Sequence, residues 1–175
     1  MPRAVFIAIL AAAFFGSFFA TLWLTEPSQN PAKPPAAADS RPIPEQFAGR
    51  HVANRADLTA AAQQVGLRPS TTMRGALDSV TRVAGGDAVI SGWFADPQGD
   101  ATPLNVLVFA GGSLAASSKT SGERPDVTQA LGLSFGSEKN VKMAVQFHCT
   151  AGDMPLVMSV SAGNQYLVLE SKPCP

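Results

Sequence analysis

The 175-residue chain contains few of the residues from which metal centres and nucleic-acid-binding surfaces are built. It has two cysteines, two histidines and a net charge of zero, and 15% of its residues are charged. A structural zinc site needs four closely spaced Cys or His ligands, and no such spacing is present. The basic residues are scattered instead of clustered, so a nucleic-acid-binding protein is excluded as well. What remains is a weakly charged chain with a long apolar run near one end.

This apolar run, Ala4 to Leu24, has 21 residues and no charge. A helix of that length measures about 30 Å, the thickness of the hydrocarbon core of a bilayer. The alternative is a cleaved signal peptide, whose apolar region is usually about 7–15 residues long and ends at a small-x-small site. The end of this run, Thr21-Leu22-Trp23-Leu24, lacks such a site. We therefore expect residues 4–24 to anchor the protein in the lipid bilayer, and Arg3 favours a cytoplasmic N-terminus.

One face of the expected span carries small residues. Ala12, Gly16 and Ala20 recur at every fourth position. Such a stripe lets two transmembrane helices approach closely, so it predicts a helix-packing surface. A chance pattern in an alanine-rich span is the alternative.

The composition divides the chain into four parts. After the anchor, residues 1–24, the segment 25–44 holds six prolines and no apolar period, which predicts a disordered Pro/Ala-rich linker. Residues 45–73 are expected to form a short helix and a connection, with the helix over residues 54–66 and Asn54 or Asp57 as its cap. Residues 74–175 alternate between strand-like runs and turn residues and predict a single domain.

The fold expected for that domain is mainly β, a single antiparallel β-sandwich of Ig-like or jelly-roll-like type. The clearest strand is Val141–His148, where apolar and mostly polar residues alternate as in a half-buried strand. Residues 104–110 are nearly all apolar, which predicts a central strand. Gly and Asn-rich breaks between the runs are typical of tight turns, and nothing supports the strand–helix alternation of a parallel sheet. The other strands are expected over residues 76–83, 88–94, 156–161 and 166–171.

Two segments carry a resemblance to a known type of module. Ser91-Gly92-Trp93-Phe94-Ala95-Asp96-Pro97 is followed by Arg124-Pro125-Asp126-Val127-Thr128-Gln129-Ala130-Leu131-Gly132. Together they resemble the G-W-A-x-D and R-P-D-V-x-x-A-x-G motifs of an uncharacterised bacterial envelope β-sandwich module, which also occurs appended to some glycan-related enzymes. The likeness covers residues 74–169, and Phe94 stands where the module usually has Ala. The resemblance implies a fold far more than an activity.

Within these motifs we expect structural roles. Trp93 is expected in the core. The segment starting at Pro125 is expected to enter a helical turn, with Asp126 capping the amide of Thr128 or Gln129. The following Ala130–Leu131 pair would then cover one end of the sandwich.

Ser113, Asp126 and His148 occur in the chain order of a hydrolase catalytic triad. Gly111-Gly112-Ser113 resembles a nucleophile elbow, and Asp126 and His148 follow in the order that α/β-hydrolases use. An elbow requires a strand-to-helix turn, whereas the residues after Ser113 resume a strand. The sequence therefore predicts a hairpin here and no catalytic residue.

The loop between Asp96 and Asp100, with Asp87 as a third carboxylate, is a candidate calcium site. Calcium takes six or more oxygen ligands, and this loop supplies too few. We expect neither a metal site nor a cofactor.

The two cysteines, Cys149 and Cys174, are predicted to form a disulfide. Their number is even, the pairing is unique, and an apolar anchor with a cytoplasmic N-terminus places them in an oxidising compartment. The bridge would fix the proline-broken tail after the last strand.

The function expected from these features is that of a non-enzymatic binding module. It is expected to be a single-pass protein of the bacterial inner membrane, with its C-terminal domain in the periplasm and an envelope protein or a glycan as its partner. One alternative is an accessory subunit of a membrane complex that acts through its transmembrane helix. A small envelope hydrolase is a third, and the oligomeric state stays open.

Overall fold

The computed structural model describes residues 41–99, 102–133 and 140–175. The predicted span, with Ala12, Gly16 and Ala20, lies outside these residues, as does most of the predicted linker. Within the described part, no helix is long and apolar enough to cross a membrane.

The described residues form short helices and eight strands. The helices are α2 (Ile43–Phe47), α3 (Arg55–Gln64) and α4 (Pro125–Leu131), with one 3-10 turn, η1 (Ala84–Gly86). The strands are β1 (Arg68–Pro69), β2 (Arg74–Arg82), β3 (Asp87–Ala95), β4 (Asn105–Ala110), β5 (Ser113–Lys119), β6 (Lys142–His148), β7 (Leu156–Val160) and β8 (Gln165–Glu170).

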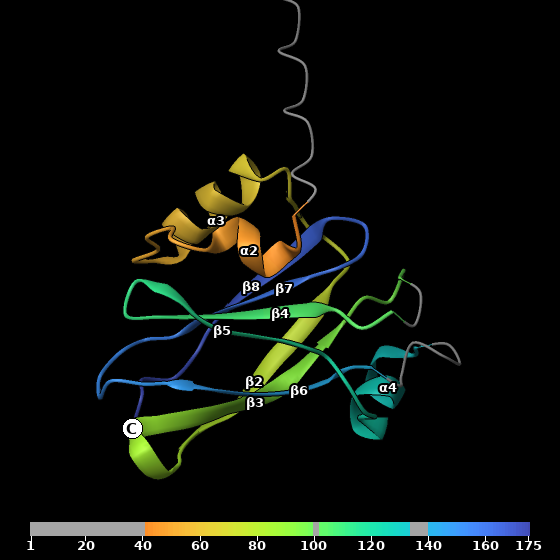
Figure 1. Ribbon diagram of the computed structural model, residues 1–175. Coiled ribbons are helices and arrows are strands. Elements are labelled where there is room, and N and C mark those ends of the chain that lie inside the picture. The colour runs from red at the N-terminus through yellow and green to blue at the C-terminus, as the bar shows by residue number, and fades with distance from the viewer. Residues whose placement is uncertain (1–40, 100–101, 134–139) are drawn as a thin grey trace, which may run out of the picture. The chain divides into compact units, whose positions relative to one another are not determined.

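The strands build two sheets that stack as a sandwich (Figure 1). The five-stranded sheet has the order β1-β8-β7-β4-β5, and the three-stranded sheet has the order β2-β3-β6. Neighbouring strands are antiparallel except β1 and β8, which pair in parallel over two residues. The prediction of a mainly β, antiparallel sandwich is confirmed. The two-residue β1 was not expected, because Arg68-Pro69 has no strand pattern.

Two hydrophobic cores lie on the two faces of the five-stranded sheet. In β4, Val106 and Val108 belong to the core between the sheets, whereas Leu107 and Phe109 belong to a second core under α2 and α3. Because both faces of β4 are covered, it has no polar alternation. This explains the uniformly apolar run from which a central strand was predicted.

Helices α2 and α3 form a layer on the outside of the five-stranded sheet (Figure 1). The predicted helix is present as α3, and the Asn54 side chain accepts the Asp57 amide at 3.0 Å, as an N-cap does. Helix α2 was not predicted, since it begins inside the proline-rich segment. Its Phe47 is fully buried and meets Phe109 edge to face, with ring centroids 5.7 Å apart.

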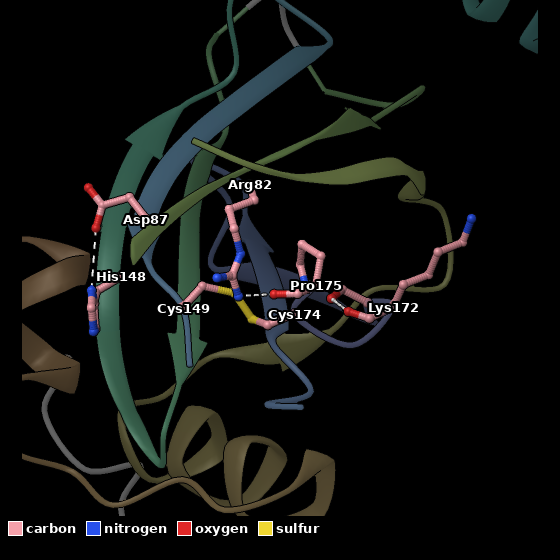
Figure 2. Close-up of a disulfide and its surroundings, with 8 residues drawn as sticks. Arg82, Asp87, His148, Cys149, Lys172, Cys174 and Pro175 are labelled. Atoms are coloured by element: carbon pink, nitrogen blue, oxygen red, sulfur yellow. Dashed lines mark hydrogen bonds and ion pairs between the residues drawn. A yellow bond between two sulfur atoms is a disulfide. The ribbon is translucent and has the colours of Figure 1, made fainter. Parts of the chain in front are cut away.

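The predicted disulfide between Cys149 and Cys174 is present (Figure 2). Cys149 follows β6 of the three-stranded sheet, and Cys174 lies in the tail after β8 of the five-stranded sheet. The Cys174 amide donates to the Asp153 carbonyl at 2.8 Å, and Arg82 donates to the Pro175 carbonyl. The bridge therefore ties the tail to the sandwich, with both cysteines buried.

Candidate binding face

The outward face of the three-stranded sheet is a regular surface formed by β2, β3 and β6. In β6, Met143, Val145 and Phe147 are buried, while the alternating residues Lys142, Ala144, Gln146 and His148 are exposed. This alternation is the one predicted from the sequence. We name the outward side of β2, β3 and β6 the outer face. Its members by strand are Ala76, Ser79 and Thr81 in β2; Asp87, Val89, Ser91 and Trp93 in β3; and Lys142, Ala144, Gln146 and His148 in β6.

Trp93 lies on this outer face and not in the core. In β3 the inward positions include Ile90 and Phe94, both fully buried, so Trp93 points outward, and it is half-buried. It stands directly between Ala76 of β2 and Lys142 of β6. The expectation of a core tryptophan is therefore wrong. A G-W pair on a strand does not reveal which of the two residues points inward, and here it is Gly92.

Two polar clusters order the rest of the outer face. Ser79 and Ser91 share a hydrogen bond of 2.9 Å between their hydroxyl groups. At the far end from Trp93, the Asp87 carboxylate accepts from Gln146 at 2.9 Å and lies 3.4 Å from Nδ1 of His148. The hydrogen bond from Gln146 and then the contact with His148 hold the pKa of Asp87 below its ordinary value. These contacts keep the polar side chains of adjacent strands in register.

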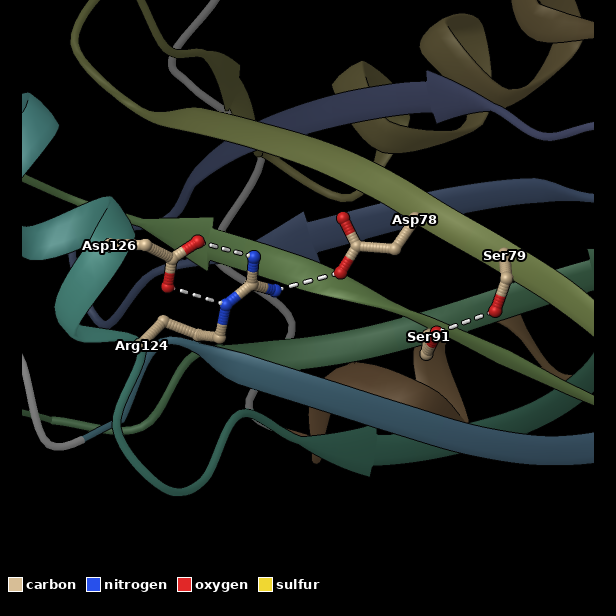
Figure 3. A network of polar contacts seen from close by, with 5 residues as sticks. All are labelled: Asp78, Ser79, Ser91, Arg124 and Asp126. Carbon is tan, nitrogen blue, oxygen red and sulfur yellow. Dashed lines mark hydrogen bonds and ion pairs between the residues drawn. The ribbon is translucent and has the colours of Figure 1, made fainter.

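An ion-pair cluster borders the outer face where α4 begins (Figure 3). Arg124 binds Asp126 through two parallel hydrogen bonds of 2.9 and 2.8 Å and reaches Asp78 of β2 with a third of 2.7 Å. The two hydrogen bonds lower the pKa of Asp126 to about 2, and the carboxylates of Asp126 and Asp78 raise the pKa of Arg124. Arg124 thus fastens α4 to a strand 46 residues earlier in the chain.

A β-bulge in β2 brings the two motif segments together. Leu77 pairs with Gly92 and Ser79 with Ser91, so Asp78 is the extra residue on β2. A side chain at Gly92 would place its Cβ 2.3 Å from the Ala76 carbonyl oxygen, which no side chain tolerates. Gly92 of the first motif therefore permits the bulge. The bulge in turn places Asp78 within hydrogen-bond distance of Arg124 of the second motif. Asp78 is the residue of this site that the sequence did not single out.

The start of α4 differs from the expectation. Pro125 is its first residue, the N-cap is Arg124, and the Arg124 side chain makes no cap hydrogen bond. Asp126 binds Arg124 instead of the amide of Thr128 or Gln129, because the guanidinium is a stronger partner than an amide. The buried residue of α4 is Val127, whereas Ala130 is exposed and Leu131 is half-buried.

The three residues in the order of a hydrolase triad, Ser113, Asp126 and His148, lie on different elements. Ser113 begins β5 after a hairpin in which Gly111 and Gly112 both have positive φ, as the sequence predicted. Among the described hydrogen bonds, those of Asp126 go to Arg124 and that of His148 goes to Asp87. No described hydrogen bond joins two of these three residues.

Of the three carboxylates of the candidate calcium site, the two described ones, Asp87 and Asp96, are not brought together. Asp87 begins β3 and Asp96 follows its last residue, so the strand separates them by roughly 30 Å at 3.3 Å per residue. Asp100 lies outside the described residues. Across the described part of the chain, no group of three or more His, Cys, Asp or Glu side chains is placed to hold a metal ion.

No protein-family model, curated protein or solved structure matches this chain.

Proposed function

We propose that this protein is a membrane-anchored binding module of the bacterial cell envelope, with its domain in the periplasm. The apolar run of residues 4–24 supports the anchor, and the Cys149–Cys174 disulfide fits an oxidising compartment. The partner binds to the outer face of the three-stranded sheet.

The proposal rests on the observation that the outward side of one sheet is covered by helices whereas that of the other sheet is not. The outward side of the five-stranded sheet is buried under α2 and α3, with Phe47 and Leu58 fully covered. The outer face instead presents exposed or half-buried side chains along all three strands. It is held in register by the Ser79–Ser91 pair and fixed at one end by Arg124. A sheet face that is uncovered and fixed by hydrogen bonds between its strands provides a rigid surface for a partner.

The chemistry of the outer face suits an envelope protein as partner. It combines a half-buried tryptophan, charges of both signs and hydroxyl groups. Tryptophan is enriched among the residues that dominate binding energies in protein interfaces, and a polar rim around it is typical of such interfaces. Trp93 is therefore the expected anchor, with Lys142 beside it.

Co-purification in a mild detergent tests this proposal. The full-length protein is expected to retain its partner, and both Trp93→Ala and Lys142→Glu are expected to lose it. Gln63→Ala, an exposed position on helix α3 over the five-stranded sheet, serves as the control. Partner binding that survives both substitutions on the outer face would overturn the proposal.

A second variant separates this function from that of an accessory subunit that acts through its transmembrane helix. Residues 1–24 are replaced by a cleavable secretion signal. A binding module keeps its partner in this form, whereas a subunit that works through its span loses it.

A further inference from the structure

Met154 is the one large apolar side chain among the described residues that is exposed, with 57% of its surface open to solvent. The other methionines in the described part of the chain, Met73, Met143 and Met158, are at most 2% exposed and belong to the two cores. A single exposed apolar residue is common on protein surfaces, so exposure alone assigns no role to Met154. Its thioether, however, has a chemistry that an exposed leucine lacks.

The cysteines do not compete with Met154 for an oxidant. Both are joined in the disulfide, so the described residues hold no free thiol. Cys149 and Cys174 are also buried, which shields the bond between their sulfur atoms. Among the sulfur-containing side chains that the structure describes, that of Met154 is therefore the one that is both reduced and open to solvent.

The exposure of Met154 is a property of the folded state and does not come from a frayed loop. Met154 lies in the connection between β6 and β7, and hydrogen bonds tie the residues beside it to the tail. The Cys174 amide donates to the Asp153 carbonyl at 2.8 Å. On the other side, the Ser171 amide donates to the Pro155 carbonyl at 3.0 Å. The backbone is thus fixed on both sides of Met154, while its side chain stays outside the cores.

A hollow of about 150 Å³ gives solvent access to a second side of Met154. Its lining includes Asp153 and the two glycines of the β4–β5 hairpin, Gly111 and Gly112. All of the lining residues are described, and so are their neighbours in the chain. A polar hollow of this size holds several water molecules, and hydrogen peroxide is little larger than water. A small oxidant therefore reaches the Met154 side chain from the hollow as well as from bulk solvent.

We propose that Met154 is the site at which this protein reacts with oxidants of the peroxide class. The sulfur lone pair attacks one peroxide oxygen, and the O–O bond breaks. The oxygen bound to sulfur passes its proton to the departing hydroxide, which leaves as water. The sulfur loses two electrons and becomes a sulfoxide, and the peroxide is reduced.

The product is compatible with the fold, because the polar S=O group is hydrated at the surface. Oxidation converts the exposed apolar side chain of Met154 into a hydrogen-bond acceptor, which changes the chemistry of this loop. The inference is independent of the outer face and of any partner that binds there.

The buried methionines are expected to react far more slowly than Met154. An oxidant reaches them only when the core opens, and openings that expose core residues are rare. A sulfoxide there would also place a polar oxygen among apolar side chains without a hydrogen-bond partner. Met154 needs no such opening, so its rate should follow its access to solvent.

Dilute hydrogen peroxide added to the full chain in a mild detergent, followed by tandem mass spectrometry of its peptides over time, tests the proposal. N-acetylmethionine amide in the same solution gives the rate of a fully accessible thioether. Met154 is expected to react within about fivefold of this reference and at least about tenfold faster than Met73, Met143 and Met158. The singly oxidised protein is expected to keep the circular dichroism spectrum of the unmodified one. Oxygen gained at Met1, which lies outside the described residues, is scored separately.

Two leucine variants and an unfolded sample serve as controls. Met154→Leu removes the sulfur at nearly constant volume, so no fast oxygen addition is expected among the remaining described methionines. Met158→Leu, at a buried position, is expected to leave the fast addition unchanged. In urea that unfolds the chain, the buried methionines should react at the rate of the reference. The proposal is overturned if the described methionines of the folded chain react at similar rates, if Met154 is as slow as the buried ones, or if its oxidation unfolds the protein.

Discussion

Arg124 is the residue that joins α4 to the edge strand β2. Its fork of donors meets Asp126 with two hydrogen bonds and Asp78 with a third, and its side chain is 24% exposed. We expect Arg124→Ala to lower the free energy of unfolding by about 1 kcal/mol, the upper end for exposed ion pairs. Arg124→Lys should recover little of this, because an ammonium group lacks the planar fork that binds Asp126 through two parallel hydrogen bonds and still reaches Asp78. Urea unfolding of the full chain in detergent measures both variants, and a lysine variant as stable as the wild type would contradict this role.

The stabilisation that the ion pair of Arg124 and Asp126 contributes depends on pH. The pKa of Asp126 in the folded protein, about 2, lies below the ordinary value of 3.8 because Arg124 binds the carboxylate. A lowered pKa means that the stabilisation is complete above about pH 5 and disappears as the pH falls through about 2. The stability difference between the wild type and Asp126→Asn should therefore shrink between these pH values. Urea midpoints at a series of pH values test this, and a difference that does not change with pH would refute it.

Strand β2 depends on the absence of a side chain at Gly92 in the neighbouring strand. A Cβ at this position would lie 2.3 Å from a backbone oxygen and 3.0 Å from the Leu77 Cα, neither of which is at the end of a flexible side chain. Gly92→Ala is expected to cost about 2 kcal/mol or more of stability, since β2 or its bulge must shift. Ser91→Ala, one residue earlier and facing outward, should cost less than about 1 kcal/mol. Thermal unfolding compares them, and equal effects would show that the close approach at Gly92 is tolerated.

Local patterns predicted most of the strands but not how they contact one another. The alternation in β6 identifies its inward and outward residues, and the apolar run of β4 identifies a doubly covered strand. Asp78 could not be identified, because its bulge depends on the register between β2 and β3 and its partner Arg124 is 46 residues away. Helix α2 was missed because Pro42 and Pro44 gave its segment the composition of a linker.

The disulfide acts on the whole molecule because it connects segments that follow strands of different sheets. It closes a loop between residues 25 positions apart. In the chain-entropy model such a loop contributes about 3–4 kcal/mol by restricting the unfolded chain. We expect reduction, or the Cys149→Ala/Cys174→Ala double variant, to lower the free energy of unfolding by about this amount. Non-reducing mass spectrometry of protein from the cell envelope should find no thiol that alkylates before reduction, and two alkylated cysteines would count against the periplasmic location.

The central claim is that the outer face, and not the helix-covered side, is where the molecule meets its partner. A photo-crosslinking amino acid placed at Ala144 on β6, and at Ala60 on α3 as a control that is also exposed, tests this in intact cells. We predict one discrete crosslinked protein from position 144 and none from position 60, and loss of that product when Trp93→Ala is added. The same product from both positions, or a product at position 144 that is indifferent to Trp93→Ala, would contradict the account.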